Sequence, residues 1–262
     1  FNYGENSAGA GTFQGDFLLL WKNLQTFLNN DLGKAINFTT STDHENFQSS
    51  RTPLLYIMHK FFNPFVENKN ALTVSSEFYK KYYDDNRTRK LILGINPGRH
   101  GAGITGIPFT DTKRLEAFCD LTIPEVSTHE ISSVFVYEFI EKYGGAKQFY
   151  QDYYINSISP LGFVIKDKKG KEKNYNYYDS KALTDAVIPF IIKTLKQQIS
   201  FGIDTDTCYC LGTGKNYKFL LALNAKHKFF NKVIPLEHPR YIMQYKSKQK
   251  QFYIDKYYDA LK

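Results

Sequence analysis

The sequence is poor in cysteine, with three such residues among 262. Cys119, Cys208 and Cys210 are too few and too unevenly spaced for a disulfide framework, a four-cysteine zinc site or a four-thiolate iron–sulfur cluster. Cys208 and Cys210 alternate within an apolar run, so we expect both as reduced thiols on one face of a buried strand. We expect neither a metal nor a cofactor, and the predicted compartment is reducing.

The sequence also lacks an apolar run of membrane-spanning length, and no secretory signal opens it. We therefore expect no membrane contact, and a location in a bacterial cytoplasm at the nucleoid or in a eukaryotic nucleus. The first residue is not Met, which we interpret as a trimmed start. Positive charge is abundant instead, with 34 Lys and Arg against 26 Asp and Glu and a pI of about 9.1. This excess favours an anionic partner such as nucleic acid, although a solvated charged surface is the simpler explanation.

A chain of this length buries a core as one unit, and we predict a single domain over residues 1–262 that acts as a monomer. Residues 1–60 are predicted as a helical N-terminal extension. Within it, residues 1–14 are expected to be irregular and residues 17–28 have helical spacing. An apolar run over residues 54–62, which contains His59, ends at the breaker pair Asn63-Pro64.

Strand and helix patterns alternate after that pair. Four short apolar runs predict buried strands at residues 90–95, 153–156, 207–212 and 232–236. Helical patterns occupy residues 131–150, 179–201, 214–226 and 247–261, and residues 166–173 predict a charged hairpin turn. Such alternation predicts a three-layer α/β/α sandwich with a central, mainly parallel four-stranded sheet.

Polar and glycine residues follow each predicted strand. Asn96 begins a Gly-rich turn after the first strand, and Asn156 ends the second. The third strand runs into Gly212-Thr-Gly-Lys215 and the fourth into Glu237-His-Pro-Arg240. Because ligands of open α/β sheets bind beyond the carboxyl ends of the strands, we expect the chemistry at this edge.

Residues 94–109, GINPGRHGAGITGIPF, resemble the active-site motif of the single-strand-selective monofunctional uracil-DNA glycosylases, which shows G-M-N-P-G, a short Gly-containing loop and T-G-x-P-F. Asn156 with Pro160-Leu161 after three residues, and then His238-Pro239-Arg240, follow in the family's order. The resemblance covers about residues 60–262. It implies the uracil-DNA glycosylase superfamily fold and a base-flipping enzyme that acts on single- or double-stranded DNA.

By this resemblance, Asn96 positions the attacking water and His238 stabilises the departing base at O2. Breaking an N-glycosidic bond builds positive charge on the sugar and negative charge on the base, so a placed water and a donor to the base are needed. Structural alternatives exist: Asn96 would close the turn into Pro97, and His238 would bond to a backbone carbonyl. The family writes H-P-S-P-R at His238, and this chain is two residues shorter there.

The resemblance makes Asn156 the reader of the base, because its amide pairs with N3–H and O4 of uracil in a way that cytosine cannot copy. Alternatively, Asn156 satisfies backbone groups at a strand end. Phe109 would stack on the flipped base or simply fill the core. Gly98 leaves room for a substituent at C5 of the pyrimidine, which favours 5-hydroxymethyluracil as a further substrate.

Several further residues are candidate DNA contacts. The turn that ends at Lys215 offers backbone amides and an ammonium group to a phosphate, or is merely a tight turn. The stretch from Arg240 to Met243 supplies a cation and an apolar wedge for the gap left by a flipped nucleotide, or only covers the sheet. Charged residues replace the family's uncharged or apolar pair after Gly98. The predicted DNA contacts are Arg99, His100, Lys215, Arg240 and Tyr241.

The sequence therefore predicts a DNA-repair glycosylase that removes uracil, and with it 5-hydroxymethyluracil, from DNA. One alternative is a relative that acts on xanthine, hypoxanthine or a modified phage pyrimidine. Another is a catalytically silent DNA-binding or nucleotide-binding module, which the presence of both Asn96 and His238 argues against.

Overall fold

The structure is a computed structural model in which residues 60–62, 69–167 and 169–262 are described. The helix expected at residues 17–28, His59 and most of the predicted N-terminal extension lie outside the described residues. The last three residues of the apolar run at 54–62 form a short strand, β1 (Lys60–Phe62).

A parallel sheet of four strands forms the centre of the fold, as the sequence predicted. Its order is β3 (Tyr153–Ser157), β2 (Arg89–Gly94), β6 (Ile203–Leu211) and β7 (Lys232–Leu236). The register places Leu93 beside both Asn156 and Cys210, so the carboxyl ends of these strands meet at one edge. All of β3 is buried, which explains why its sequence is nearly continuous in apolar and aromatic residues.

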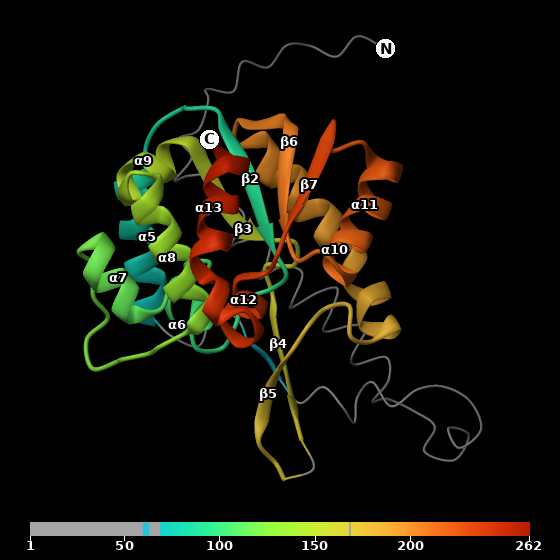
Figure 1. Cartoon of the computed structure of the whole chain (residues 1–262). Helices are drawn as coiled ribbons and strands as arrows, with labels where there is room; N and C mark the ends of the chain where they lie inside the picture. The colour runs from blue at the N-terminus through green and yellow to red at the C-terminus, as the bar shows by residue number, and fades with distance from the viewer. Residues whose placement is uncertain (1–59, 63–68, 168) are drawn as a thin grey trace, which may run out of the picture.

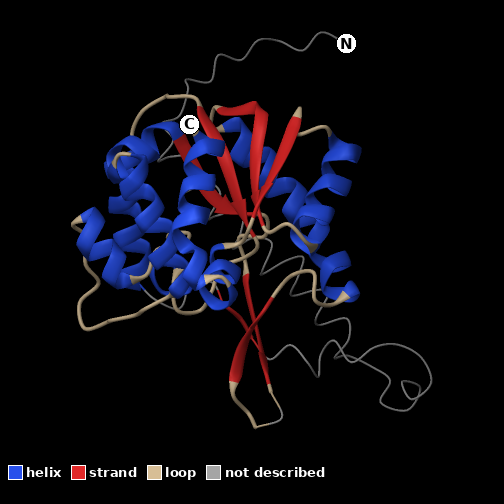
Figure 2. Ribbon diagram, in the orientation of Figure 1, coloured by secondary structure: helices blue, strands red, loops and turns tan. Residues whose placement is uncertain are grey.

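Helices cover both faces of this sheet (Figures 1 and 2). On one face lie α10 (Lys181–Ser200) and α11 (Lys215–His227). The other face carries α5 (Lys69–Tyr83), α8 (Ile131–Tyr143), α9 (Gly145–Asp152) and α13 (Lys250–Leu261). Shorter helices complete this side: α6 (Ala102–Thr105), α7 (Thr112–Cys119), α12 (Pro239–Tyr245) and the 3₁₀ turn η2 (Ser247–Gln249). The three-layer sandwich is thus confirmed.

One predicted helix is divided in the structure, and α7 was not predicted. The helix expected over residues 131–150 is two helices, because Gly144 and Gly145 adopt φ angles of 131° and 87° that end α8 and redirect the chain into α9. The sequence pattern also missed α7, which begins where the Asp111 carboxylate accepts the amide hydrogen of Arg114.

A second, antiparallel sheet of three strands was not predicted, although its hairpin turn was. Strand β4 (Gly162–Lys166) lies between β1 and β5 (Glu172–Tyr175). The β4–β5 hairpin projects from the body on the side where the parallel strands end (Figure 1). Asp167 closes the turn, since its Oδ1 accepts the amide hydrogens of Lys169 and Lys171. Gly170 supplies the left-handed residue, with φ of 76°.

At the opposite edge of the parallel sheet, a buried arginine pairs with a carboxylate that is partly exposed. Arg89, at the start of β2, is 1% exposed and makes two parallel hydrogen bonds to the Asp85 carboxylate, at 2.8 and 2.9 Å. Its Nε donates to the backbone carbonyl of Tyr150. Burying a guanidinium is tolerated only when its charge and donors are satisfied, as they are here.

The three cysteines are free and buried, as predicted, with Cys208 and Cys210 both on β6. In the part of the chain that the structure describes, no helix has the length and apolar character needed to cross a membrane.

Candidate active site

A cavity of about 530 Å³ opens where the parallel strands end, between the loop after β2, the start of α12 and the exit of the hairpin. Of the residues predicted for the site, Asn96, Gly98, Phe109, His238, Arg240 and Tyr241 all line it. It also contains side chains that the sequence pattern did not single out, namely Glu130, Ser132, Ser157, Asn174, Asn176 and Tyr178. The predicted edge of the sheet therefore holds the site, but the hairpin and the start of α8 supply much of its lining.

The side chain of Asn96 is fixed from two directions by the chain that leaves the hairpin. Its Nδ2 donates to the backbone carbonyl of Tyr175 at 3.2 Å, and its Oδ1 accepts from the amide of Tyr177 at 3.3 Å. Each end of the amide can make one more hydrogen bond, because the nitrogen has a second hydrogen and the oxygen has a second lone pair. Asn96 thus lines the cavity in one orientation with groups left to hold a water molecule.

His238 caps α12 with one ring nitrogen. Its Nδ1 accepts the amide hydrogen of Arg240 at 3.1 Å, so the neutral ring carries its proton on Nε2. Burial is the main cause that lowers the pKa of His238, to about 4, and the positive charge of Arg240 is the second cause. The ring is therefore neutral near pH 7 and offers one N–H donor beside the cavity.

Phe109 forms a wall of the cavity next to this histidine. The two ring centroids are 5.8 Å apart, and the Phe109 ring lies so close to Gly94 that a Cβ there would fall 2.6 Å from the ring. Phe109 adopts φ of 54°, a left-handed conformation that is rare for bulky residues. The neighbouring Thr105 holds this turn, because its hydroxyl contacts the carbonyl oxygens of Ile107 and Thr110. The aromatic wall is thus fixed by a strained turn.

Asn156 lies deeper than expected. Its side chain is 6% exposed, its Nδ2 donates to the Tyr154 hydroxyl at 2.7 Å, and its Oδ1 accepts the amide hydrogen of Ser157. Ser157 lines the cavity, whereas Asn156 is not among the lining residues of the described chain. The amide keeps one hydrogen and one lone pair for a ligand, so its role as the reader of the base stays a prediction.

The structure explains why position 98 is a glycine, which the sequence alone did not reveal. A Cβ at Gly98 would lie 2.6 Å from Oε1 of Glu130, and one at Gly101 would lie 1.9 Å from Oε2. The glycines therefore admit a carboxylate against the loop that carries Asn96. Burial is the main cause that raises the pKa of Glu130, to about 7, and the negative charge of Asp111 is the second cause. No motif pointed to Glu130, because it precedes α8 and approaches the loop only in the folded chain.

The predicted DNA contacts surround the cavity at different distances. Arg240 and Tyr241 line it, and Arg99 and His100 line an adjoining groove. Lys215 is exposed at the N-terminus of α11, with its Nζ 5.8 Å from the ring centroid of Tyr178, a residue of the cavity wall.

The apolar wedge expected after Arg240 is not formed as predicted. Ile242 is 0% exposed and belongs to the core, because α12 turns that face of the helix inward. The exposed apolar surface of α12 comes instead from Tyr241 and Tyr245, which are 43% and 72% exposed and have ring centroids 5.6 Å apart. An aromatic pair at the rim of the cavity therefore replaces the predicted wedge.

No group of three or more metal-ligating side chains occurs in the described residues.

Comparison with known proteins identifies the family. Residues 80–262 match the family model described as the Uracil DNA glycosylase superfamily. The chain belongs to this superfamily. Among solved structures, SMUG2 from Pedobacter heparinus is 48% identical, with a TM-score of 0.79, and the match covers 95% of this chain and 96% of that chain. No functionally curated protein matches the sequence.

Membership of the uracil DNA glycosylase superfamily gives the cavity its chemistry. The protein is a monofunctional DNA glycosylase, an enzyme of base-excision repair that hydrolyses N-glycosidic bonds in damaged DNA. Such a reaction needs a cavity for a base that has left the DNA stack, a place for water and a donor for the departing base. The glycosylase cavity holds an oriented amide, a neutral imidazole and an aromatic wall.

Proposed function

We propose that this glycosylase removes uracil from DNA, and with it uracils substituted at C5 such as 5-hydroxymethyluracil. The observation that carries the proposal is the neutral His238, whose Nδ1 is occupied by the amide of Arg240 and whose Nε2–H is left for a ligand of the cavity. A neutral N–H donor stabilises negative charge on the O2 of a departing uracil without transferring its proton.

In this proposal Asn96 holds the attacking water. The amide is anchored on Tyr175 and Tyr177, so its free hydrogen and lone pair have fixed directions. An amide is a poor base, and it suits a reaction in which water attacks a sugar that has already become cationic. The contribution of Asn96 is therefore orientation of the water, and the negative charge of the departing base is stabilised by the N–H of the neutral His238.

The flipped base would stack on Phe109 and be read by Asn156. Phe109 presents its ring beside His238, which places stacking and O2 stabilisation on adjacent walls. Asn156 would use its remaining N–H toward O4 and its remaining lone pair toward N3–H, while the Tyr154 hydroxyl fixes the amide orientation. That fixed orientation favours uracil over cytosine, whose donors and acceptors are reversed.

The proposed tolerance of a C5 substituent depends on the wall that contains Gly98, where the space beside the glycine is taken by the Glu130 carboxyl. Gly98 adds no side chain to the cavity, and the atom nearest to its missing Cβ is Oε1 of Glu130. A hydroxymethyl group at C5 would meet a polar acceptor there rather than an apolar side chain. Around the cavity, the proposed contacts to DNA are Arg99, His100, Lys215, Arg240 and Tyr241.

The proposal is tested by single-turnover cleavage of oligonucleotides that each carry one lesion. Uracil, 5-hydroxymethyluracil, hypoxanthine and xanthine are compared in single-stranded and duplex DNA, and abasic sites are revealed by hot alkali. Uracil and 5-hydroxymethyluracil are expected to be cut, and His238→Ala should slow both by about a hundredfold or more. Cleavage of the purines alone would establish the alternative specificity, and binding without cleavage would establish a silent module.

The role of Asn156 is tested by Asn156→Asp. An ionised aspartate facing O4 sets acceptor against acceptor, which costs on the order of 1–3 kcal/mol, so the variant should lose uracil activity. Cytosine presents a donor at N4, and the variant should gain weak activity on cytosine in single strands. Tyr154→Phe is the companion, because it removes the hydroxyl that orients the amide. If Asn156→Asp cuts uracil at the wild-type rate, Asn156 does not read the base and its role is structural.

A further inference from the structure

A second concave surface continues from the active-site cavity. This groove has a volume of about 540 Å³ and lies between the β4–β5 hairpin, the loop after Gly98 and the start of α8. It shares four lining residues with the cavity, Glu130, Ser132, Asn174 and Arg240. A ligand bound in the cavity could therefore extend into the groove without leaving the protein surface.

Cationic side chains dominate the groove. Arg99, Lys171, Lys173 and Arg240 line it, against the two carboxylates of Glu130 and Glu172. Among the described residues, no carboxylate lies within 4.0 Å of the charged nitrogens of Arg99, Lys171 or Arg240. The raised pKa of Glu130 further reduces the negative charge near pH 7. The groove is therefore electropositive, and among the described residues only Lys173 of its four Lys and Arg side chains makes an ion pair, with Asp167.

Of the two histidines that line the groove, His100 responds to this charge. Burial, followed by the charges of Arg99 and Arg240, lowers the pKa of His100. Arg99 itself is held in place through its backbone, whose amide donates to Oδ1 of Asn174 on β5. The loop after Asn96 and the hairpin are thus joined by this hydrogen bond, and each brings positive charge to the groove.

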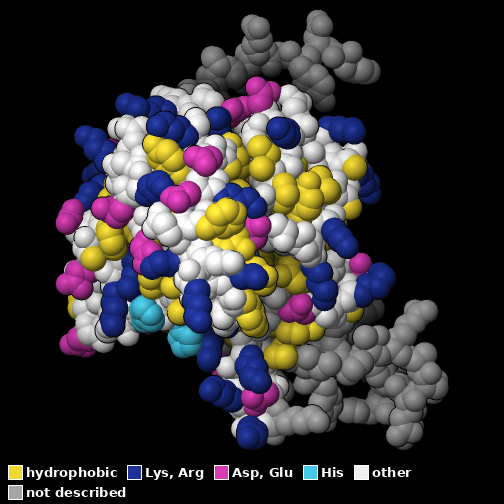
Figure 3. All heavy atoms as spheres, in the orientation of Figure 1, with side chains coloured by type: hydrophobic (Ala, Val, Ile, Leu, Met, Phe, Trp, Pro, Cys, Tyr) yellow, Lys and Arg dark blue, Asp and Glu magenta, His cyan; other side chains and the backbone are white. Residues whose placement is uncertain are grey.

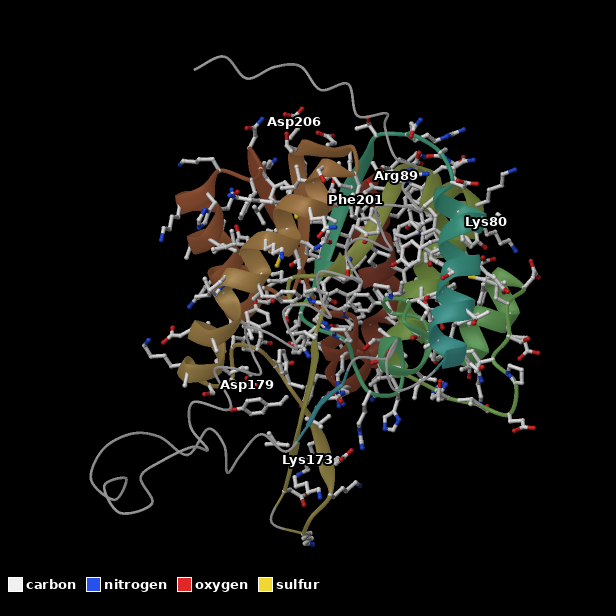
Figure 4. All side chains as sticks on the ribbon, turned by 180° about the vertical axis from the view of Figure 1, so that it is seen from behind. Lys80, Arg89, Lys173, Asp179, Phe201 and Asp206 are labelled. Atoms are coloured by element: carbon white, nitrogen blue, oxygen red, sulfur yellow. The ribbon has the colours of Figure 1, made fainter. Side chains whose placement is uncertain are left out.

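The turn of the hairpin leaves lysine side chains facing the solvent. Asp167, the acidic residue of its turn, is occupied by the backbone amides of Lys169 and Lys171 and by an ion pair with Lys173 at 3.1 Å. Lys169, Lys171 and Lys173 are exposed, and the Lys173 side chain remains 60% exposed despite this pair. Figure 3 shows Lys and Arg side chains gathered on the projecting hairpin, and Figure 4 places Lys173 there, far from Asp206 at the other end.

We propose that this groove binds the phosphates of the nucleotides adjoining the flipped one on the same DNA strand. The backbone of a strand whose base occupies the cavity must leave over its rim, and the groove is the electropositive surface that is continuous with that rim. Lys171 and Lys173 on the hairpin and Arg99 opposite them neutralise these phosphates. The proposal rests on DNA being the substrate and adds a strand-tracking site that the hairpin provides.

If the groove binds these phosphates, the affinity for DNA should depend on the length of the strand on one side of the lesion. The probe is a fluorescein-labelled single strand with one 2′-fluoro-2′-deoxyuridine, shortened stepwise from its 5′ or its 3′ end. Lys171→Gln/Lys173→Gln is compared with Lys193→Gln/Lys196→Gln, which makes the same charge change on exposed positions of α10. Affinity is measured by anisotropy between 50 and 300 mM salt, and thermal melting checks that each variant is folded.

The hairpin variant should bind the long strand about tenfold more weakly at low salt, and its salt slope should fall by about 1.4, or about 0.7 for each lost phosphate contact. Shortening one end should weaken the wild type and leave the hairpin variant unchanged, while shortening the other end weakens both equally. The α10 variant should behave like the wild type. Equal effects of truncation on all proteins, or an unchanged slope, would overturn the proposal.

The same titration with an undamaged strand keeps this test separate from the proposed base specificity. If the protein cuts no uracil but its affinity shows the one-sided length dependence, the groove proposal stands and the proposed uracil activity is wrong. Binding of an acidic polypeptide, polyglutamate, in place of DNA at the same salt would identify a general anion surface and overturn strand tracking.

Discussion

The amide of Asn96 is anchored at both ends by main-chain atoms, and we propose that it acts on the reaction and not on DNA binding. Asn96→Ala should lower the single-turnover rate by about a hundredfold or more, because an oriented water is needed only on the way to the transition state. The dissociation constant for DNA, measured by anisotropy, should change less than about twofold. Asn231→Ala, an exposed asparagine at the opposite edge of the sheet, is the control and should leave both values unchanged. A parallel loss of affinity would contradict the assigned role.

Glu130 should make stability fall as pH rises. Its pKa is about 7 in the folded protein and near 4.3 in an unfolded chain, so between these values only the folded state holds the proton. Stability from this group is thus greatest below pH 4 and declines until about pH 7. Glu130→Gln removes the effect, and its stability relative to wild type should rise by on the order of 2–3 kcal/mol between pH 5 and pH 8.

Urea denaturation at four pH values measures this difference. Glu116→Gln on the exposed side of α7 is the matched control, and its difference from wild type should not vary across the same range. Three groups act on the Glu130 carboxyl: the charge of Asp111 raises its pKa, whereas Arg240 and Ser133 lower it. A constant difference for Glu130→Gln would mean that the carboxyl titrates normally.

At the scale of secondary-structure elements, the ion pair between Asp85 and Arg89 ties the end of α5 to the start of β2. Asp85→Ala should destabilise the fold by about 1–3 kcal/mol, because it leaves the buried guanidinium of Arg89 without its counter-charge, although Asp85 itself is partly exposed. The double variant with Arg89→Met should recover much of this loss, which chemical denaturation would measure. Asp84→Ala, one residue earlier and exposed, should have little effect. Equal stability of the two Asp→Ala variants would refute the assignment.

Elements built from continuous local patterns were predictable. The four parallel strands follow from short apolar runs that end in turn residues, and β7 has the predicted bounds. The three-stranded antiparallel sheet was missed because its pairing joins β1 to β4 across about a hundred residues, which no local period encodes. The break between α8 and α9 depends on two consecutive glycines whose positive φ angles appear only in the folded backbone.

The candidate site was predictable where residues follow strands. Asn96 and His238 were found because motif and strand end coincide, and both line the cavity. Glu130 and Asn174 were missed because they come from a helix start and a hairpin, where single polar residues are ordinary. The side chain of Asn156 lies deeper than its position at a strand end suggested, since the Tyr154 hydroxyl binds it.

At the scale of the whole molecule, the positive charge of the chain should make DNA binding strongly dependent on salt. Lys215→Ala should reduce the slope of log K against log salt by about 0.7 for single strands or 0.9 for duplex, if its ammonium neutralises one phosphate. Lys226→Ala, exposed at the far end of α11, is the control and should keep the wild-type slope. An unchanged slope for Lys215→Ala would mean that residues 212–215 are only a turn.

The two sheets have a consequence for how this enzyme could diverge. Among the described strands, those of the hairpin sheet pair only with one another, and the link from the hairpin to Asn96 uses the backbone atoms of Tyr175 and Tyr177. Backbone atoms are supplied by every residue type. The length and side chains of the hairpin tip can therefore change between homologues, and with them the proposed contacts to DNA, while the amide of Asn96 keeps its orientation. The fold in this way separates a part of the molecule whose side chains can vary from the part that orients Asn96.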